Sequence, residues 1–174
     1  MAKDPDVRRI VVGVDGSAES VAALRWACRE ASLRGAEVLA VLALESACHQ
    51  VASYAAPAPR QSNGSWGAAR DVLRQSVSEV LSLFPGVRVR TEIAEGLAAR
   101  VLLDQAEDAD MLVLGRNLDG PDPYRAAGPV IRVCLRAARC PVVIVGAVDT
   151  VPRDPADHVP ESWQRALEGS GAAR

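Results

Sequence analysis

Blocks of apolar residues divide the chain into segments with the lengths of strands and helices. Four apolar runs are short, rich in Val, Ile and Leu, and bounded by polar or turn-forming residues. Such runs are typical of strands that are buried on both faces of a parallel sheet. They predict strands at residues 8–15, 36–44, 111–114 and 141–145.

The segment 87–93 has a different pattern. Val87, Val89, Thr91 and Ile93 alternate with charged residues. This period of two predicts a strand with one exposed face, and a half-exposed strand among buried ones belongs at a sheet edge.

Between the runs, apolar residues recur at helical spacing. Ser17 is a predicted N-cap, with Ser20 as a second candidate, and Gly35 fits the residue after the helix end. The residues expected to face inward from this first helix are Val21, Leu24, Cys28, Ala31 and Leu33. Further helices are predicted from about Ala68 to Phe84, from Leu97 to Glu107, and from Gly128-Pro129 onward.

Strands and helices therefore alternate through five strands. This order predicts an α/β fold: a doubly wound open sheet of five mainly parallel strands with helices on both faces. One domain is expected over residues 1–146. Residues 45–67 are too long for an ordinary connection and are expected to form a loop or lid. Residues 147–174 read as a proline-rich tail with a short helix at 161–168.

Composition narrows the class of protein. The net charge of −2 and the pI of about 5.7 argue against a nucleic-acid partner, because nucleic-acid-binding domains usually carry a basic face. The sequence lacks an apolar run of the length that spans a membrane, about 18 residues, and a secretory signal pattern. We therefore expect a cytoplasmic protein with no membrane partner.

Cysteine and histidine positions do not suggest a metal site or a catalytic triad. Cys28, Cys48, Cys134 and Cys140 lack metal-ligand spacing, and around His49 and His158 no carboxylate or cysteine has the spacing of a triad or a metal site. We expect reduced thiols and no catalytic residues. A redox role for Cys28 or Cys48 is an alternative, and Tyr54 and Trp66 are candidates either to close over a ligand or to anchor the 45–67 loop.

The stretch from Asp110 to Gly146 has the layout of a phosphate-binding site. An apolar run ends at Gly115, a loop of turn formers follows, and Gly128-Pro129 begins a helix. In parallel α/β sheets, backbone N–H groups at such a glycine turn and helix start face an anion.

Together these residues resemble the universal stress protein family. The resemblance rests on VVGVDGSAES after the first strand, the G…G-x-V loop and the RCPVVIV ending, and it covers about 8–146. ATP-binding members of that family carry a loop of the form G-x2-G-x9-G-[S/T]. The resemblance implies that Asp15 meets the ribose or adenine end of a nucleotide and that Val41 packs near the base.

Two positions of the loop depart from the family pattern. Leu118 replaces the second glycine, and Pro129 replaces the hydroxyl residue and lacks a backbone N–H. Each hydrogen bond lost to a charged group could cost about 1.5–3 kcal/mol. Arg116 and Arg125, with Arg132 beyond them, could compensate by gripping phosphate. Asp119 and Asp122 would oppose this, unless Mg²⁺ bridges them to the ligand.

The candidate nucleotide site, with no metal of its own, comprises Val14, Asp15, Val41, Gly115, Arg116, Arg125, Gly128 and Val130. Asp15 has a second interpretation, as a cap for the following helix. The main hypothesis is a non-catalytic regulatory or binding protein whose nucleotide site is weakened or lost. The alternative is a stress protein that binds ATP with Mg²⁺ and hydrolyses it slowly or phosphorylates itself. The resemblance also implies a homodimer through the last strand, Val142 to Val145.

Overall fold

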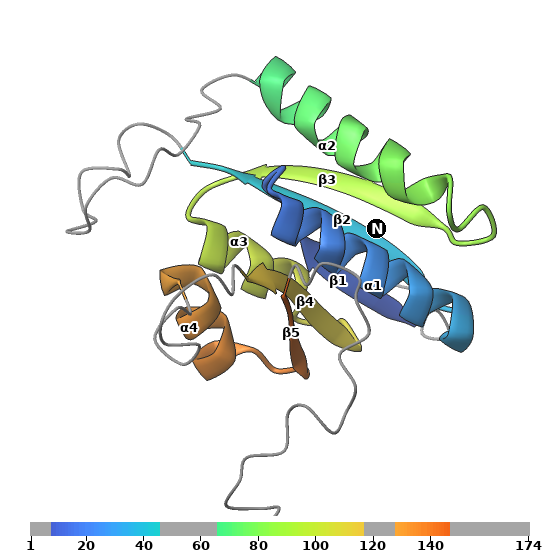
Figure 1. The fold of residues 1–174 in the computed structure, drawn as a ribbon. Helices are drawn as coiled ribbons and strands as arrows, with labels where there is room; N and C mark the ends of the chain where they lie inside the picture. Colours follow the sequence, from blue (N-terminus) through green and yellow to red (C-terminus); the bar gives the residue numbers. More distant parts are fainter. Residues whose placement is uncertain (1–7, 46–65, 117–127, 147–174) are drawn as a thin grey trace, which may run out of the picture.

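A computed structural model describes residues 8–45, 66–116 and 128–146. Within these ranges strands and helices alternate in the predicted order (Figure 1). The elements are β1 (Arg9–Gly13), α1 (Ala18–Arg34), β2 (Glu37–Leu44), α2 (Trp66–Leu81), β3 (Val89–Glu95), α3 (Ala98–Gln105), β4 (Met111–Arg116), α4 (Pro129–Ala137) and β5 (Val142–Gly146).

The five strands form one all-parallel sheet in the order β3-β2-β1-β4-β5. The chain moves outward from β1 to β3, then returns to the other side of β1 to add β4 and β5. The half-exposed strand β3 lies at an edge, as its alternating pattern predicts. The reversal between β1 and β4 is the place where doubly wound sheets open a crevice at the carboxyl ends of their strands.

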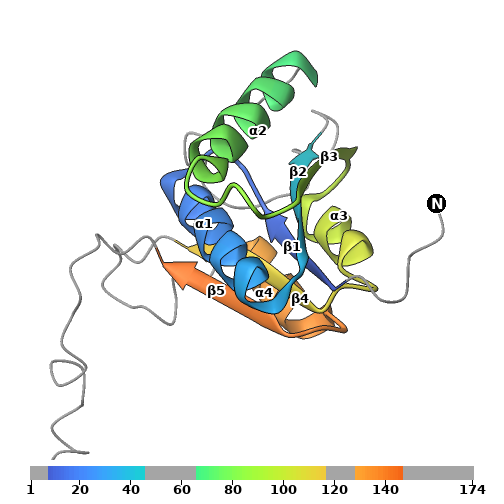
Figure 2. The ribbon, with the colours of Figure 1, turned by 90° about the vertical axis from the view of Figure 1, so that its right-hand side faces the viewer.

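The helices cover both faces of the sheet, with α1 and α2 on one and α3 and α4 on the other (Figure 2). Successive side chains of β1 pack on alternate faces of the sheet. Ile10 and Val12 belong to the core under α1 and α2, while Val11 belongs to the core under α3 and α4. This placement explains why the first apolar run is continuous, since a central strand with both faces covered has no exposed position.

The ends of α1 agree with the sequence. Ser17 is the N-cap, and Gly35 ends the helix in the left-handed conformation with φ of 63°. The prediction that Leu33 faces inward is wrong, because its side chain is 75% exposed. Leu33 lies two residues beyond buried Ala31, which at 100° per residue turns it away from the sheet. Small residues such as Ala23 and Ala27 occupy the inward face instead.

Other boundaries differ from the prediction by one to three residues. Helix α2 already begins at Trp66, and β3 covers Val89–Glu95 where residues 87–93 were expected. A shift of two preserves which strand residues share a face, so the edge assignment of β3 holds. The other parts of the predicted 45–67 loop, and the tail with its predicted helix at 161–168, lie outside the described residues.

Candidate functional site

A cavity of about 340 Å³ opens at the carboxyl ends of the central strands. Its walls come from the ends of β1, β2 and β4 and from the first turns of α1, α3 and α4. The volume is at the small end of the range for ligand pockets, roughly 300–1,000 Å³. The lining residues are Gly13, Val14, Asp15, Ser17, Ser20, Val41, Ala43, Ala98, Leu102, Leu114, Gly115, Arg116, Gly128, Pro129, Val130 and Ile131.

The structure brings the candidate site residues from three distant parts of the chain to this one cavity. Those that line it are Val14, Asp15, Val41, Gly115, Arg116, Gly128 and Val130. Arg125 lies outside the described residues, as do Leu118, Asp119 and Asp122. Arg132, which the sequence suggested as a compensating cation, is an exposed residue of α4 and does not line the cavity.

Sequence reasoning missed part of the apolar wall. Ala43 of β2, together with Ala98 and Leu102 of α3, completes it. The place of Ala43 in this wall could have been predicted from the sequence, because it lies two residues after Val41 and therefore on the same face of the strand. The α3 residues carried no such signal, since their position depends on how α3 packs over the sheet.

Side chains at the start of α1 cap the helix by hydrogen-bonding to one another and to the backbone. Asp15 Oδ1 accepts hydrogen bonds from the Ser17 backbone N–H at 2.9 Å and from the Ser17 hydroxyl at 2.5 Å. Ser17 Oγ in turn accepts from the Ser20 N–H at 3.2 Å, and Ser20 Oγ donates to the Ser17 carbonyl at 2.9 Å. The capping interpretation of Asp15 is thus the one that these contacts support. The carboxylate nevertheless remains exposed at the cavity wall.

Gly115 is required by packing. A Cβ atom at this position would lie 2.3 Å from the backbone oxygen of Glu19 and 2.7 Å from the Ser20 nitrogen. The end of β4 therefore touches the backbone of the first turn of α1, which only glycine permits. Packing against α1 therefore explains the glycine at position 115, whether or not the loop binds a phosphate.

Arg116, the last residue of β4, is a half-buried cation that lines the cavity. Its Nε and Nη2 atoms are buried and have no hydrogen-bond partner in the described part of the chain. Strand alternation places its side chain on the α3 and α4 side of the sheet, since Leu112 and Leu114 of the same strand pack there. Buried charged donors are normally paired, so this guanidinium stands out.

The starts of α3 and α4 differ in how they are completed. The Ala98 N–H of α3 donates to Glu45 Oε1 at 3.2 Å. Helix α4 begins after Gly128, which has no side-chain cap, and carries Pro129 at its first turn and no acidic residue there. The backbone N–H groups of Val130 and Ile131 fall in the part of a helix that has no intrahelical acceptor. Both residues line the cavity.

The thiols of the two helices are buried. Burial raises the pKa of the Cys28 thiol to about 11, and burial also raises the pKa of Cys134, with Cys140 adding to the effect. A thiol needs to ionise to react, so these shifts oppose the redox alternative for Cys28. Cys48 lies outside the described residues.

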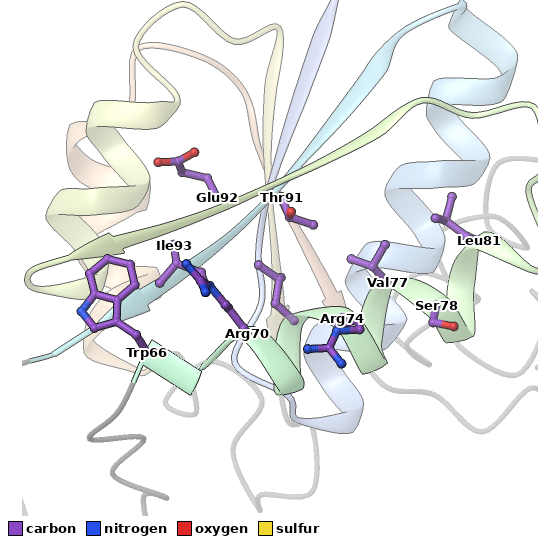
Figure 3. Close-up of a pocket in the computed structure, with 10 residues that line it drawn as sticks. Trp66, Arg70, Arg74, Val77, Ser78, Leu81, Thr91, Glu92 and Ile93 are labelled. Atoms are coloured by element: carbon purple, nitrogen blue, oxygen red, sulfur yellow. The ribbon is translucent and has the colours of Figure 1, made fainter. Parts of the chain in front are cut away.

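A second concavity, of about 690 Å³, lies between α2 and β3. Figure 3 shows Trp66, Arg70 and Arg74 along α2, with Glu92 turned to the other side of β3. Trp66 is thus a helix residue that lines this groove, and it does not line the cavity at the carboxyl edge. The groove is larger, but its arginines are exposed. The cavity, in contrast, is lined by Arg116, which has buried nitrogens without a partner, and by the start of α4, which has no side-chain cap.

Within the ranges that the structure describes, His, Cys, Asp and Glu side chains do not gather in groups of three or more that would hold a metal ion. The same ranges contain no helix with the length and apolar character needed to cross a membrane.

An all-parallel five-stranded sheet with a cavity at the carboxyl ends of β1 and β4 defines a doubly wound α/β domain. Residues 6–146 match the model of the universal stress protein family, and the chain belongs to that family.

Curated relatives carry the same family name. The chain is 34% identical over 147 residues to a universal stress protein of Mycolicibacterium smegmatis, and 35% identical over 154 residues to one of Mycobacterium tuberculosis. These alignments cover 83% and 84% of this chain and 50% of each relative. The chain therefore spans about half the length of the curated relatives it matches.

Solved structures share the fold. A universal stress protein from Archaeoglobus fulgidus in complex with dAMP matches with a TM-score of 0.59 and 24% identity, over 79% of this chain and 97% of that one. A universal stress protein in complex with cAMP matches with a TM-score of 0.59 and 19% identity, over 82% and 98%. At this identity the likeness shows the fold alone.

Proposed function

We propose that this domain is a non-catalytic binding module that takes an adenine nucleotide in the cavity at the carboxyl edge of the sheet. One observation carries the proposal: strand ends far apart in the sequence converge on a single cavity that has apolar walls at one side and unpaired donors at the other. Solved relatives with the same fold hold dAMP or cAMP. The chemistry of the cavity fits that class of ligand.

The apolar side suits the base. Val41 and Ala43 of β2, with Ala98 and Leu102 of α3, offer a surface for a flat ring. Asp15 also lines the cavity and offers an acceptor for a ribose hydroxyl, although Ser17 already uses one of its oxygens. Arg116 and the first turn of α4 face the anionic group. This arrangement supports binding and orientation of a nucleotide.

The polyphosphate end of the site is expected to be weak. Pro129 offers neither a backbone N–H nor a hydroxyl at the first turn of α4. We propose that ATP binds more weakly than it would to a loop with a hydroxyl residue at this position. The non-catalytic assignment is supported by Asp15, which is the one carboxylate among the described lining residues and is engaged in capping α1.

Calorimetric titration of the purified chain with adenosine, AMP and ATP tests the proposal, together with the variant Pro129→Ser. We expect heat of binding with wild type, and a gain in ATP affinity of about 10- to 150-fold for the variant, equivalent to 1.5–3 kcal/mol. Absence of heat with every adenine ligand at millimolar concentration would overturn the proposal. Sustained ATP turnover would support the slow hydrolysis alternative instead.

We also propose that two copies of the domain pair through β5. The two sheet edges differ: β3 exposes the charged or polar residues Arg90, Thr91 and Glu92, whereas every residue of β5 is apolar or glycine and half-buried. Charged side chains protect an edge from pairing, and β5 lacks this protection. Light scattering after size exclusion is expected to show a dimer for wild type and a monomer for Ile144→Arg. A wild-type monomer at micromolar concentration would contradict it.

A further inference from the structure

Two of the three guanidinium nitrogens of Arg116 lack the acceptors that such a group normally has. Its Nε and Nη2 atoms are out of contact with solvent and have no hydrogen-bond partner in the described part of the chain. A charged donor left unpaired in the interior destabilises the folded state. An acceptor supplied by a ligand would remove that penalty, and Arg116 lines the cavity in which the ligand would lie.

The described residues that line the cavity do not provide a charged partner for Arg116. Arg116 is the one cation and Asp15 the one carboxylate among the described lining residues. Asp15 Oδ1 is hydrogen-bonded to Ser17, at the start of α1. The charge that balances Arg116 is therefore expected to come with the ligand.

The start of α4 adds donors for the same charge. Val130 and Ile131 follow Gly128 and Pro129, and no side chain caps this helix end. A nine-residue helix presents a partial positive charge at its start, and the absence of an acidic residue in the first turn leaves that charge unbalanced. Arg116 and this first turn line the same cavity, so one anionic group is expected to contact both.

We propose that Arg116 determines the charge class of the ligand: a nucleotide with a single phosphate group, bound without a divalent cation. The inference rests on the proposed adenine-nucleotide function. Among the described residues that line the cavity, one guanidinium and one helix start match one phosphate group. A triphosphate carries several negative charges, which proteins usually balance with Mg²⁺ and further cations. The cavity of about 340 Å³ also favours a small ligand.

Calorimetry with adenosine, AMP, cAMP and ATP tests this assignment, each in MgCl₂ and in EDTA. Wild type is expected to bind AMP at least about tenfold more tightly than adenosine, a ratio equivalent to 1.4 kcal/mol, with no effect of EDTA. Arg116→Gln should lose this preference and bind adenosine as wild type does. Arg136→Gln, which removes an exposed charge from the last turn of α4, away from the cavity, should keep it. The cAMP arm shows whether a phosphodiester satisfies Arg116 as well as a monoester does.

The outcomes separate this inference from the proposed function. Failure of both adenosine and AMP to bind wild type would overturn the proposed function and this inference with it. Binding of adenosine with no gain for AMP, or an AMP preference that survives in Arg116→Gln, would overturn the inference alone. Tighter binding of MgATP than of AMP would do the same.

A stability measurement without ligand distinguishes a binding role from a structural one. Replacing Arg116 by Met removes the unpaired charge and keeps a long apolar stem. The unliganded variant should melt at the same temperature as wild type or about 2–4 °C higher, and AMP should no longer raise its Tm. A Tm several degrees below that of wild type would show that Arg116 supports the fold, and would overturn the proposal.

Discussion

Helices α1 and α4 begin at the same edge of the sheet and differ in how their first turns are completed. In α1, Asp15, Ser17 and Ser20 bond to one another and to the backbone, so the donors at this helix start are largely used within the protein. In α4, Gly128 provides no side-chain cap and Pro129 opens the helix. One start is closed, and the other is open to a cavity that also contains an unpaired guanidinium.

This difference in capping indicates that two loops with similar sequences have different roles. Both follow an apolar strand, and both contain glycine before a helix. The loop after β1 stabilises the fold through its own hydrogen bonds. The start of α4 keeps donors available, and its helix dipole favours an anion there. An anionic ligand is therefore expected at α4 and not at α1.

The largest expected effect comes from Gly115→Ala, which tests whether the end of β4 serves the start of α1. The added Cβ would lie 2.3 Å from the Glu19 oxygen, which is backbone and cannot turn aside. We expect a loss of about 3 kcal/mol in unfolding free energy, measured by urea denaturation. Gly128→Ala is the matched control, because nothing lies within 4 Å of its added Cβ. Equal stability of the two variants would contradict the packing role of Gly115.

A pH effect is expected from the cysteine that α1 buries against the sheet. Burial raises the pKa of Cys28 to about 11, above its value of 9.0 in the unfolded chain. The folded state therefore keeps its proton where the unfolded state loses it. This stabilisation is complete below pH 9 and is lost as pH rises towards 11, by up to about 2 kcal/mol.

The measurement for Cys28 is the free energy of unfolding between pH 8 and 11, in wild type and in Cys28→Ala. The variant should show a shallower fall over this range, whatever its stability at pH 8. Parallel curves for the two proteins would show that ionisation of Cys28 does not contribute.

A smaller effect is expected from Ser17→Ala, which opens the closed helix start. The variant loses the side-chain acceptor for the Ser20 N–H and a donor to Asp15. It should lose about 1 kcal/mol of stability by chemical denaturation. Ser78→Ala, at an exposed position in α2, is the control and should change little. A loss no greater than that of the control would show that the α1 cap is not stabilising.

The smallest effect is expected from Gly128→Ser, which would close the open helix start. A serine hydroxyl at the N-cap would accept from the first turn of α4 and raise stability by a few tenths of a kcal/mol. The same hydroxyl would occupy donors that the ligand uses, so AMP affinity should fall. Stability and affinity that rise together would contradict the assignment of these donors to the ligand.

Much of the fold could be predicted because its signals are local. Continuous apolar runs identified β1, β2, β4 and β5, and the alternation around Val89 and Ile93 identified β3 as an edge strand. The apolar run of β5 did not by itself show that this strand lies at the other edge. Ser17 and Gly35 identified the ends of α1. Leu33 was misplaced, since helical spacing alone did not show where the inward face ends. Trp66 was assigned to a loop, although Ser65, a residue type favoured at helix N-caps, directly precedes it in the sequence.

Less of the candidate site than of the fold could be predicted from the sequence. Sequence order placed Asp15, Gly115 and Gly128 at strand ends and at a helix start, and the sheet order then brought them together. The steric need for Gly115 depends on the backbone of α1, which lies almost a hundred residues earlier in the chain. The burial of the Arg116 Nε and Nη2 atoms depends on the tertiary structure around the end of β4. Such long-range contacts leave no local pattern in the sequence.

Residue-resolved NMR of AMP binding tests the central claim most directly. During a titration of isotopically labelled protein, the amide signals of Val130 and Ile131 and the guanidinium signal of Arg116 should shift together, with one affinity. The amides of Ser17 and Ser20 should move much less, because their hydrogen bonds are already made within the protein. Shifts centred on Ser17 and Ser20, or on Arg70 and Arg74 of the groove beside α2, would contradict the account.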